Sequence, residues 1–411
     1  MISPHQLPLA REIVSAGKSI PDFEFIYVPE FDMDDERRAL GWQDQKHSWI
    51  LSPSSKSSGH EICKKSDFLF SYLRTFDIFK ARIANNTVYC SERWFKPLIG
   101  IARLLLPSYW RMARCMTTLL SKNAGFFYFP IGIHAARDMA RLCGLMHGDL
   151  RCLFRAPKLD FERRPGGRIY LSSSTLQLQT PTPTKSKKYC LDKMRMWGYF
   201  VEPSNLTTND QRPTTNDQRL TTNTLKVLWV GRLLKLKRVD TIIRAVGELA
   251  RGGKFHSPTP TSNSNSSKIT LDIYGIGPEE ARLKKLAAKY GDVIKFHPPV
   301  PIAEVRRLMR EHDVYVMSSN GYEGWGAVVS EALEEGMLTL GTHEAGSSAT
   351  ILPESHLFHA GDWRALAELL RKAADGELKP TGIGEWTAKK AAELLVVSAR
   401  KSKKEVPLTK R

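Results

Sequence analysis

The chain has 411 residues, of which 61 are lysine or arginine and 43 are aspartate or glutamate, so its formal net charge is +18. At roughly 150 residues per domain, this length predicts two domains, or three at most, each large enough to bury its own core. Hydrophobic residues make up 42% of the chain, charged residues 25% and aromatic residues 9%. This composition excludes a wholly disordered chain, a collagen-like fibre and a disulfide miniprotein, and it predicts a soluble globular protein.

Three features of the sequence bear on its location. No apolar stretch approaches the ~18 uncharged residues that a membrane-spanning helix needs. The opening residues, MISPHQLPLARE, lack the basic-then-apolar order of a secretory signal. The six cysteines all lie in the first half of the chain and include no C-x-x-C pair, which argues against a zinc ribbon and a disulfide framework. Together these features favour a cytoplasmic protein.

The positive charge is concentrated in one region. Residues 93–168 carry 14 lysines and arginines against 4 acidic residues. Within this region, WFKPLIGIARLLLPSYWRMAR (residues 94–114) interleaves basic and aromatic side chains. One interpretation is an anionic membrane surface, where each lysine or arginine near the headgroups contributes about 1 kcal/mol. Another is a core-packed helix with a solvated basic face. Nucleic acid is a third candidate, but no recognisable binding module supports it, so no specific nucleic-acid partner is expected.

Low-complexity stretches divide the chain. A basic surface insertion is predicted near residues 155–188, which end in SSSTLQLQTPTPTKSKK. The tandem repeat TTNDQRP, TTNDQRL has neither helical nor strand periodicity, so residues 205–224 are predicted to be a linker. The expected division is therefore a first domain over residues 1–204, a second domain over 225–380, and a C-terminal helix with a basic tail over 381–411.

The second half alternates regularly between strand and helix patterns. Five short apolar runs read as strands: KVLWVG, KITLDIYGIG, VIKFHPPV, DVYVMSS and MLTLGTH. Amphipathic helical patterns separate them, among them VDTIIRAVGELARGG and IAEVRRLMREH. Strands that take turns with helices across brief connections predict a parallel sheet covered on both faces. The second domain is therefore expected to be a doubly wound α/β unit.

The first half gives a weaker pattern of the same kind. Residues 23–31, 86–90 and 125–133 are predicted strands separated by helical segments. The chain opens directly at ISPHQLPLAREIV, which has the pattern of a strand-to-helix turn, so the first strand of this domain is predicted to be absent. The fold expected overall is α/β, with two Rossmann-like domains facing across a cleft.

Charged residues follow the first strand of the second domain. In open α/β sheets, ligands bind at the carboxyl ends of strands, where glycine turns and helix N-termini expose backbone N–H groups to anions. Gly231 and Arg232 follow the strand and Lys237 comes five residues later, so two cations are placed to close over one pyrophosphate. Taken alone, such a basic turn is more often a solvated loop. The turn YGIGP (274–278) has room for a base or a ribose, although a plain tight turn explains it equally well.

Two carboxylates lie in the segment SSNGYEGWGAVVSEALEEG. Glu323 precedes the glycine-flanked loop 324–326, and Glu331 lies eight residues later in the following helical pattern. One carboxylate on a loop and one on a helix can accept hydrogen bonds from two separate sets of sugar hydroxyls. The competing interpretation of Glu331 alone is a solvated helix residue.

In combination, these motifs resemble a known family. The order Gly-Arg-x4-Lys, Tyr-Gly-x-Gly-Pro, FHPPV and Glu-Gly-Trp-Gly-x4-Glu-Ala is similar to the nucleotide-sugar domain of family 4 glycosyltransferases, which are of the two-domain GT-B type. The resemblance spans residues 226–375. In the first half, ISPHQLPLA, DDERRALGW and CSERWFK resemble a bacterial surface-polysaccharide branch of this family.

The resemblance implies a retaining glycosyltransferase of the hexosyltransferase type. Such an enzyme moves a sugar from a nucleoside-diphosphate sugar, held by the second domain, to a lipid-linked or polysaccharide acceptor on the first domain. By the family pattern, Arg232 and Lys237 hold the diphosphate, Glu331 holds the ribose, and Glu323 contacts the donor sugar near the reacting face. The backbone of Gly324, Trp325 and Gly326 shapes the sugar pocket.

Further implications concern the first domain and the metal. The family places His5 on the acceptor side, and His134, expected to close the strand 125–133, is a candidate for the catalytic centre. A lone histidine after a strand is more often an ordinary loop residue. The family needs no divalent metal, and Asp32-Met33-Asp34 is interpreted as a turn and helix N-cap rather than a metal site. No cofactor other than the nucleotide-sugar co-substrate is expected.

The sequence also departs from the family. Ala349 stands where an acidic residue is common, and Pro299 where a glycine is usual. The alternative function is therefore a basic membrane- or nucleic-acid-binding protein that retains a degenerate, inactive transferase domain. The C-terminal helix is expected to cross back onto the first domain, as it does in the family.

Overall fold

The computed structural model describes residues 5–21, 23–27, 47–50, 68–71, 87–96, 100–122, 125–153, 193–204, 224–252 and 268–404. The described residues form two compact units. The first contains residues up to Glu202 together with the chain from Glu385 onward, and the second contains Pro203–Gly384. Residues 154–192 and 205–223, which hold the predicted insertion and almost all of the predicted linker, lie outside the described ranges.

The second unit is built on a six-stranded parallel sheet in the order β6-β5-β4-β7-β8-β9. The inner strands β7 and β8 are buried along their whole length, whereas β5 alternates between buried and partly exposed residues. The chain runs from β4 outward to β6, then returns to the other side of β4 and continues to β9. The strands are β4 (Thr224–Val230), β5 (Lys268–Tyr274), β6 (Ile294–His297), β7 (Val314–Met317), β8 (Leu338–Thr342) and β9 (Leu357–Phe358).

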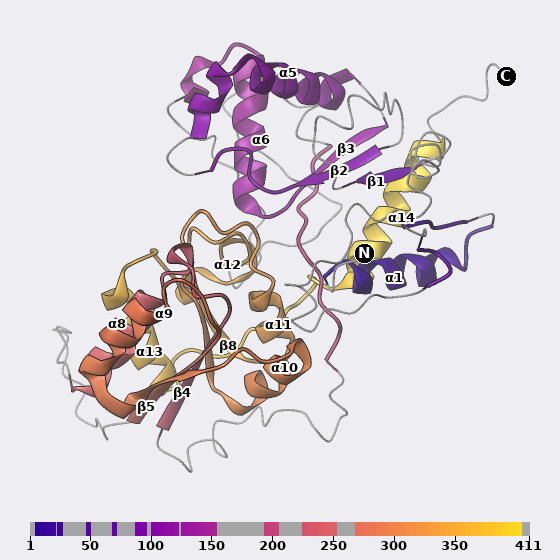
Figure 1. The fold of residues 1–411 in the computed structure, drawn as a ribbon. Helices are drawn as coiled ribbons and strands as arrows, with labels where there is room; N and C mark the ends of the chain where they lie inside the picture. Colours follow the sequence, from indigo (N-terminus) through magenta and orange to yellow (C-terminus); the bar gives the residue numbers. More distant parts are fainter. Residues whose placement is uncertain are drawn as a thin grey trace. The chain divides into compact units, whose positions relative to one another are not determined.

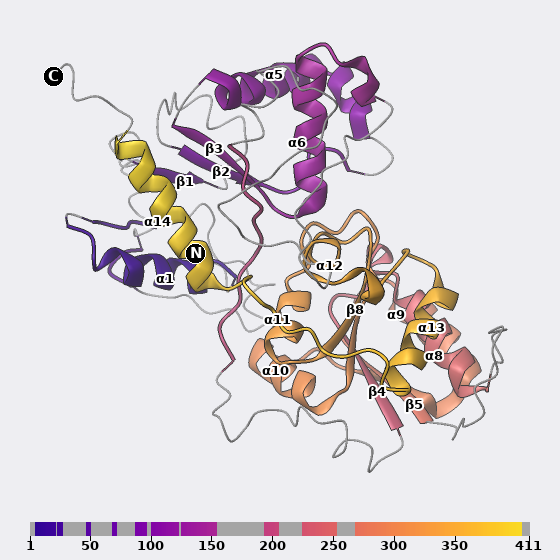
Figure 2. The ribbon, with the colours of Figure 1, turned by 180° about the vertical axis from the view of Figure 1, so that it is seen from behind.

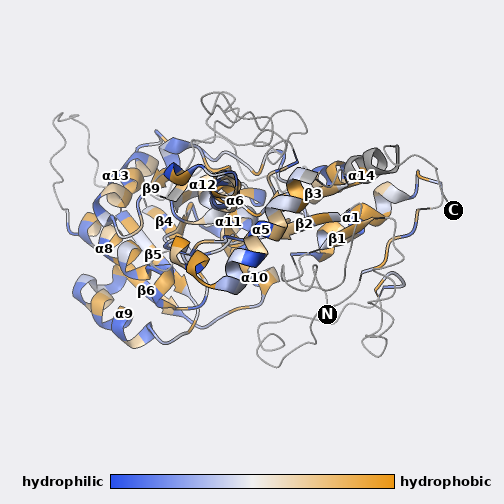
Figure 3. Ribbon diagram, turned by 90° about the horizontal axis from the view of Figure 1, so that it is seen from above, coloured by the Kyte–Doolittle hydropathy of each residue, from blue (hydrophilic) through white to orange (hydrophobic). Residues whose placement is uncertain are grey.

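Helices cover both faces of this sheet. Figures 1 and 2 show α8, α9 and α13 on one face and α10 and α11 on the other. Each turns an apolar stripe inward: in α10, Val305, Leu308 and Met309 are buried at the i, i+3, i+4 spacing of one helix face. The same alternation is visible as mixed blue and orange on the helix ribbons in Figure 3. The helices are α8 (Val239–Ala250), α9 (Glu280–Ala287), α10 (Ile302–Glu311), α11 (Val328–Glu334), α12 (Gly346–Ile351) and α13 (Trp363–Ala374). Short 3-10 helices at Lys235–Lys237, Ala288–Val293 and Glu354–His356 complete the unit.

The first unit contains a three-stranded parallel sheet in the order β1-β2-β3. Isolated parallel bridges from Tyr128 to Met194 and from Ile131 to Trp197 add the segment at 193–197 beside β3. Trp197 is fully buried, with its ring tilted against Phe129 and edge-on to Phe200. The elements are β1 (Leu69–Ser71), β2 (Thr87–Ser91), α5 (Pro107–Lys122), β3 (Phe126–Pro130) and α6 (Ile133–Met146), with 3-10 helices at Gly100–Leu105 and Leu150–Leu153.

The two ends of the described chain meet in the first unit. Helix α1 (Leu7–Gly17) lies beside α14 (Ala388–Lys404), and both views show the pair side by side. Helix α14 therefore belongs to the first unit, although it follows the second unit in the chain. Within the described residues, no helix is both long and apolar enough to cross a membrane.

The α/β class and the parallel sheets confirm the predicted fold class, and all five strands predicted for the second half are present. Two predictions in the first half are wrong in detail. The predicted strand 23–31 is not a strand over residues 23–27, where only Tyr27 forms an isolated bridge, to Ile50. Its apolar residues instead pack with Leu7 and Ala10 of α1 in a small separate cluster. The predicted strand 125–133 ends at Pro130, so His134 lies in the first turn of α6 and does not close a strand. The predicted absence of a first strand is left untested, because residues 1–4 lie outside the described ranges.

We predict that Gly275→Ala destabilises the second unit. A Cβ at Gly275 would lie 1.8 Å from the Gly231 carbonyl oxygen, so the two turns would have to separate. The free energy of unfolding should fall by about 2 kcal/mol or more in chemical denaturation. Gly291→Ala is the comparison, because Gly291 has a positive φ but no atom near its Cβ position. It should cost only the ~1 kcal/mol of backbone strain. Equal losses in the two variants would show that the close approach is unimportant.

Candidate functional site

Two glycine turns meet at the carboxyl edge of the second unit's sheet. The Gly231 N–H donates to the Tyr274 carbonyl at 3.0 Å, and the Gly275 N–H donates to the His297 carbonyl at 3.2 Å. The Leu233 N–H donates to the Ile276 carbonyl at 2.9 Å. The loops after β4 and β5 are thus joined backbone to backbone, and the missing side chain of Gly275 permits their close approach.

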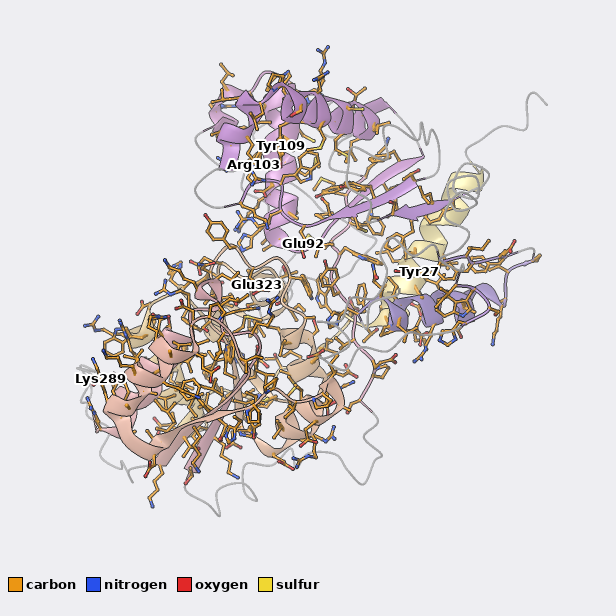
Figure 4. All side chains as sticks on the ribbon, viewed as in Figure 1. Tyr27, Glu92, Arg103, Tyr109, Lys289 and Glu323 are labelled. Atoms are coloured by element: carbon orange, nitrogen blue, oxygen red, sulfur yellow. The ribbon has the colours of Figure 1, made fainter. Side chains whose placement is uncertain are left out.

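Lys237 and Glu323 form the charged centre of this edge. Lys237 ends the 3-10 helix Lys235–Lys237 that follows β4, and its ammonium donates to Glu323 Oε2. Glu323 lies on the loop after β7, and Figure 4 labels it there. Both side chains are mostly buried, so the pair is less screened than a surface ion pair.

The position of this pair follows from the sheet topology. Strands β4 and β7 are neighbours, yet the chain leaves β4 toward β5 and returns to β7 from β6. The order of the strands therefore reverses between β4 and β7, and the loops that follow them diverge there. In open α/β sheets this switch point is where ligands bind.

Hydroxyl and amide groups hold the two loops together. The Ser318 hydroxyl donates to the Lys237 carbonyl at 2.6 Å, and the Asn320 N–H donates to the Leu236 carbonyl at 2.9 Å. The Ser319 hydroxyl donates to Glu323 Oε2 at 3.0 Å, so this oxygen accepts from both Ser319 and Lys237. The Glu323 carboxylate is therefore fixed from two sides.

The loop 324–326 is tied to the start of α12. The Gly346 N–H donates to the Gly324 carbonyl at 3.1 Å, and the Ser347 N–H donates to the Trp325 carbonyl at 2.9 Å. The Trp325 side chain is buried in the interior of the unit. Gly326 has φ +83°, and a Cβ there would lie 2.8 Å from the Met317 methyl and 3.5 Å from Glu323 Cγ. The loop backbone thus lies directly against the side chain of Glu323.

Glu331 is the second carboxylate of the site and is 8% exposed. Burial raises the pKa of this carboxyl to about 7, the charge of Arg306 opposes the rise, and the charge of Glu335 adds to it. No hydrogen bond to the Glu331 side chain is formed within the described part of the chain. A solvated helix residue, the competing interpretation from the sequence, is wrong.

Tyr315 connects the two carboxylates. Its side chain is buried on β7, and burial raises the pKa of the hydroxyl well above its ordinary value. The charges of Glu323 and Glu331 both raise this pKa further, so both carboxylates lie within electrostatic range of one hydroxyl. Of the four charged residues predicted for the donor site, Lys237 and Glu323 are in contact, and Glu331 is buried on the helix that follows the loop of Glu323. Arg232 is exposed on the turn after β4.

The two predicted histidines lie in the first unit. His134 is half-buried in the first turn of α6, directly after the carboxyl end of β3. His5 is half-buried before α1 and its ring stacks on Tyr199 at 6.3 Å between centroids. Burial lowers the pKa of His5 to about 4, so its ring is neutral at pH 7. Both histidines therefore belong to the first unit, not to the unit that carries Lys237 and Glu323.

Sequence reasoning missed a polar pair beside His5. The Tyr199 hydroxyl donates to Glu92 Oε1 at 2.9 Å, although 107 residues separate them in the chain. Glu92, labelled in Figure 4, follows β2 directly, and a charged residue at the end of a buried strand was the available signal. Nothing in the sequence pointed to Tyr199. Asp32 and Asp34 lie outside the described ranges, and inside them no three metal-ligating side chains gather in an arrangement that could hold an ion.

We predict that Glu331→Gln stabilises the fold at alkaline pH. The folded pKa of about 7 lies above the ordinary 4.5, so the folded state loses stability as the pH rises from about 4.5 to 7. The amide resembles the protonated acid and does not carry this cost. At pH 8 the variant should exceed the parent in free energy of unfolding by up to roughly 3 kcal/mol, and at pH 4 the two should agree. A difference that is constant over this pH range would contradict the raised pKa.

Part of the chain is similar in sequence to known glycosyltransferases. Residues 210–390 match the family described as "Glycosyl transferases group 1". An uncharacterized glycosyltransferase of Methanocaldococcus jannaschii is 34% identical over 103 residues, which is 25% of this chain and 23% of that protein. The D-inositol 3-phosphate glycosyltransferase of Frankia alni is 33% identical over 114 residues, 26% of this chain and 25% of that protein. The chain thus spans about a quarter of the length of these relatives.

One solved structure is similar along nearly the whole chain. The apo form of the lipopolysaccharide outer core galactosyltransferase WaaB aligns with a TM-score of 0.51 and 11% identity, covering 98% of this chain and 96% of that one. At this identity the likeness concerns the fold. Residues 210–390 thus match the Glycosyl transferases group 1 model, and the α/β fold of the chain is similar to that of this galactosyltransferase.

Proposed function

We propose that the chain is a retaining glycosyltransferase of the hexosyltransferase type, which moves a sugar from a nucleoside-diphosphate sugar to a lipid-linked or polysaccharide acceptor. The observation that carries the proposal is the contact between Lys237 and Glu323 at the switch point of the matched domain, with Glu331 buried nearby. A cation and two carboxylates at one sheet edge match the chemistry of such a donor. The diphosphate is anionic, while the sugar and ribose offer hydroxyl donors.

In this proposal, binding of the donor exchanges partners within the site. Lys237 turns from Glu323 to the diphosphate, and Arg232 closes over the same group from the turn after β4. Glu323 is then released to accept hydrogen bonds from the donor sugar, and Glu331 accepts from the ribose hydroxyls. The backbone of Gly324, Trp325 and Gly326 forms the wall of the sugar pocket. Its fixed geometry, set by the hydrogen bonds to α12, supports that role.

The proposed reaction breaks the bond between sugar C1 and the diphosphate oxygen and forms a bond from the acceptor hydroxyl oxygen to C1. The electron pair leaves with the nucleoside diphosphate, and the acceptor proton passes to that leaving group. Lys237 and Arg232 stabilise the growing negative charge on the diphosphate, the role that a divalent metal has in other transferases. No metal or further cofactor enters the proposal.

The first unit is proposed to supply the acceptor side. His134 follows the carboxyl end of β3, a position from which ligands of α/β sheets are bound, and it is proposed to act at the catalytic centre. His5, neutral at pH 7, is proposed to contact the acceptor. A lipid-linked acceptor would place the enzyme on the inner, cytoplasmic face of a membrane, in polysaccharide biosynthesis.

We predict that nucleotide sugars stabilise the protein and that Lys237→Ala impairs transfer. Thermal-shift screening with UDP, GDP and ADP sugars identifies the donor, and hydrolysis or transfer of that donor gives the rate. Lys237→Ala should lower kcat/KM at least tenfold, about 1.4 kcal/mol of transition-state stabilisation. Lys235→Ala is the matched control, because Lys235 is an exposed lysine on the same 3-10 helix.

Two outcomes would contradict this prediction. Parent rates in Lys237→Ala would remove the lysine from the site. An absence of stabilisation by every nucleotide sugar would support instead the alternative of a basic binding protein with a degenerate transferase domain.

We also predict that donor affinity rises with pH through the neutral range. Ribose hydroxyls donate to an ionised carboxylate, and the Glu331 carboxyl ionises only near pH 7. The dissociation constant of the donor should therefore rise about tenfold between pH 8 and pH 6 in calorimetry. A nucleotide sugar is used because its diphosphate has no proton to lose in this range. In Glu331→Gln, binding should be weak and independent of pH, and an unchanged pH profile would exclude Glu331 as the titrating group.

A further inference from the structure

The first unit exposes a compact group of large apolar side chains. Leu105, Leu106 and Trp110 are 85%, 55% and 44% exposed, at the junction between the 3-10 helix Gly100–Leu105 and α5. The Trp110 N–H donates to the Leu106 carbonyl at 3.0 Å, so these two residues lie one helical turn apart. Exposed apolar residues are ordinary when scattered, but three within six positions form a patch.

Arginines surround this patch. Arg103 lies over the ring of Tyr109 at 5.8 Å from its centroid, and Figure 4 shows the two side by side. Arg111 and Arg114 are exposed on α5. Residues 93–137 contain seven lysines and arginines and no aspartate or glutamate. The patch is therefore apolar at its centre and positive around it.

These arginines lack the carboxylate partners that exposed cations have elsewhere in the chain. In the second unit, Arg282 pairs with Glu279, and Lys284 pairs with Glu280, each within one helical turn. Arg307 and Arg371 have similar partners. No carboxylate forms an ion pair with Arg103, Arg111 or Arg114 among the described residues. Their positive charge is thus left uncompensated on the surface.

Helix α5 has a second face, which packs into the core of the first unit. Ala113, Met116 and Leu120 are fully buried, so these residues form the face of α5 that contributes to the core. The core-helix interpretation of residues 94–114 thus holds for the inner face of α5. Trp110, Arg111 and Arg114 belong to the face that the core does not use.

We propose that Leu105, Leu106 and Trp110, with Arg103, Arg111 and Arg114, form a lipid-docking surface for an anionic bilayer. Leucine and tryptophan side chains enter the boundary between headgroups and acyl chains, while the arginines bind lipid phosphates. The chemistry favours a bilayer over a protein partner because exposed apolar side chains occur together with exposed cations that pair with no carboxylate among the described residues. Docking needs no nucleotide sugar, so it stands or falls independently of the proposed transferase activity.

The first test is flotation of the full chain with phosphatidylcholine vesicles, with and without phosphatidylglycerol. The chain should float only with the anionic vesicles, and high salt should weaken binding without abolishing it, because salt screens the arginines but not the apolar contact. Binding in Arg111→Gln/Arg114→Gln should fall about fivefold for each arginine removed. Lys285→Gln/Lys289→Gln removes two exposed charges from the second unit and should bind like the parent.

A second set of variants tests the apolar centre. Leu105→Ser/Leu106→Ser should lose most of the vesicle binding, whereas Leu105→Met/Leu106→Met should retain it. Brominated acyl chains should quench part of the tryptophan fluorescence, and that part should be missing in Trp110→Phe. Circular dichroism melts should match the parent, since all three side chains are exposed.

Three results would overturn the proposal. One is the absence of flotation with any vesicle at low salt. Another is equal loss of binding in the two charge variants, which would show that only net charge matters. The third is tighter binding to DNA than to anionic vesicles, which would assign the arginines to nucleic acid.

Discussion

The contact between Lys237 and Glu323 is the interaction on which the candidate site depends. It joins the loop after β4 to the loop after β7, at the one place in the sheet where neighbouring strands are followed by chains that leave in opposite directions. Ser318 and Asn320 fasten the same two loops through backbone carbonyls. A site built here is held in its backbone, and its Glu323 carboxylate accepts from both Lys237 and Ser319. That combination suits a pocket that must hold an anion and a neutral sugar together.

Two buried carboxylates differ in their hydrogen bonds: Glu331 on α11 and Glu335 directly after this helix. Glu335 is almost fully buried and accepts from Arg306 at 2.5 Å, from Arg310 at 2.8 Å and from the Ser204 hydroxyl at 3.1 Å. Glu331, one turn earlier, has no such hydrogen bond in the described structure, and its pKa is raised to about 7 by burial. Burying an ionised carboxylate without hydrogen-bond partners lowers the stability of the fold. The partners of Glu335 offset this loss, whereas no such partner offsets it at Glu331 in the described structure. Perturbed groups of this kind concentrate at functional sites.

The same helix links this acid to the start of the second unit. Arg306 is hydrogen-bonded to Glu335, and its charge is the strongest influence opposing the rise in the pKa of Glu331. Glu334 and Glu335 in turn hold Ser204, through the Ser204 N–H at 2.9 Å and the hydroxyl. One cluster of charges thus fixes both the entry of the chain into this unit and the electrostatic setting of Glu331.

The sequence predicted the second unit well because its signals are local. Strands buried on both faces give apolar runs such as KVLWVG, and amphipathic helices give the spacing seen at Val305, Leu308 and Met309. Motif order predicted Lys237, Glu323 and Glu331 for one sheet edge, and the fold places Lys237 in contact with Glu323. The first unit was harder because its contacts are distant in sequence. Tyr199 meets Glu92 across 107 residues, and the apolar residues at 23–27 pack on α1 instead of forming a strand. No local sequence pattern predicts either contact.

The environment of the Tyr315 hydroxyl could not be predicted from the sequence. Its position in DVYVMSS marks it only as a buried strand residue, and burial of its ring is what the sequence leads one to expect. Burial raises the pKa of its hydroxyl, and the charges of Glu323 on a loop and Glu331 on a helix raise this pKa further. Each carboxylate disfavours ionisation of the tyrosine, so the hydroxyl remains a proton donor at neutral pH. The pKa of a buried strand residue therefore depends on a loop and a helix that the sequence of the strand itself does not specify.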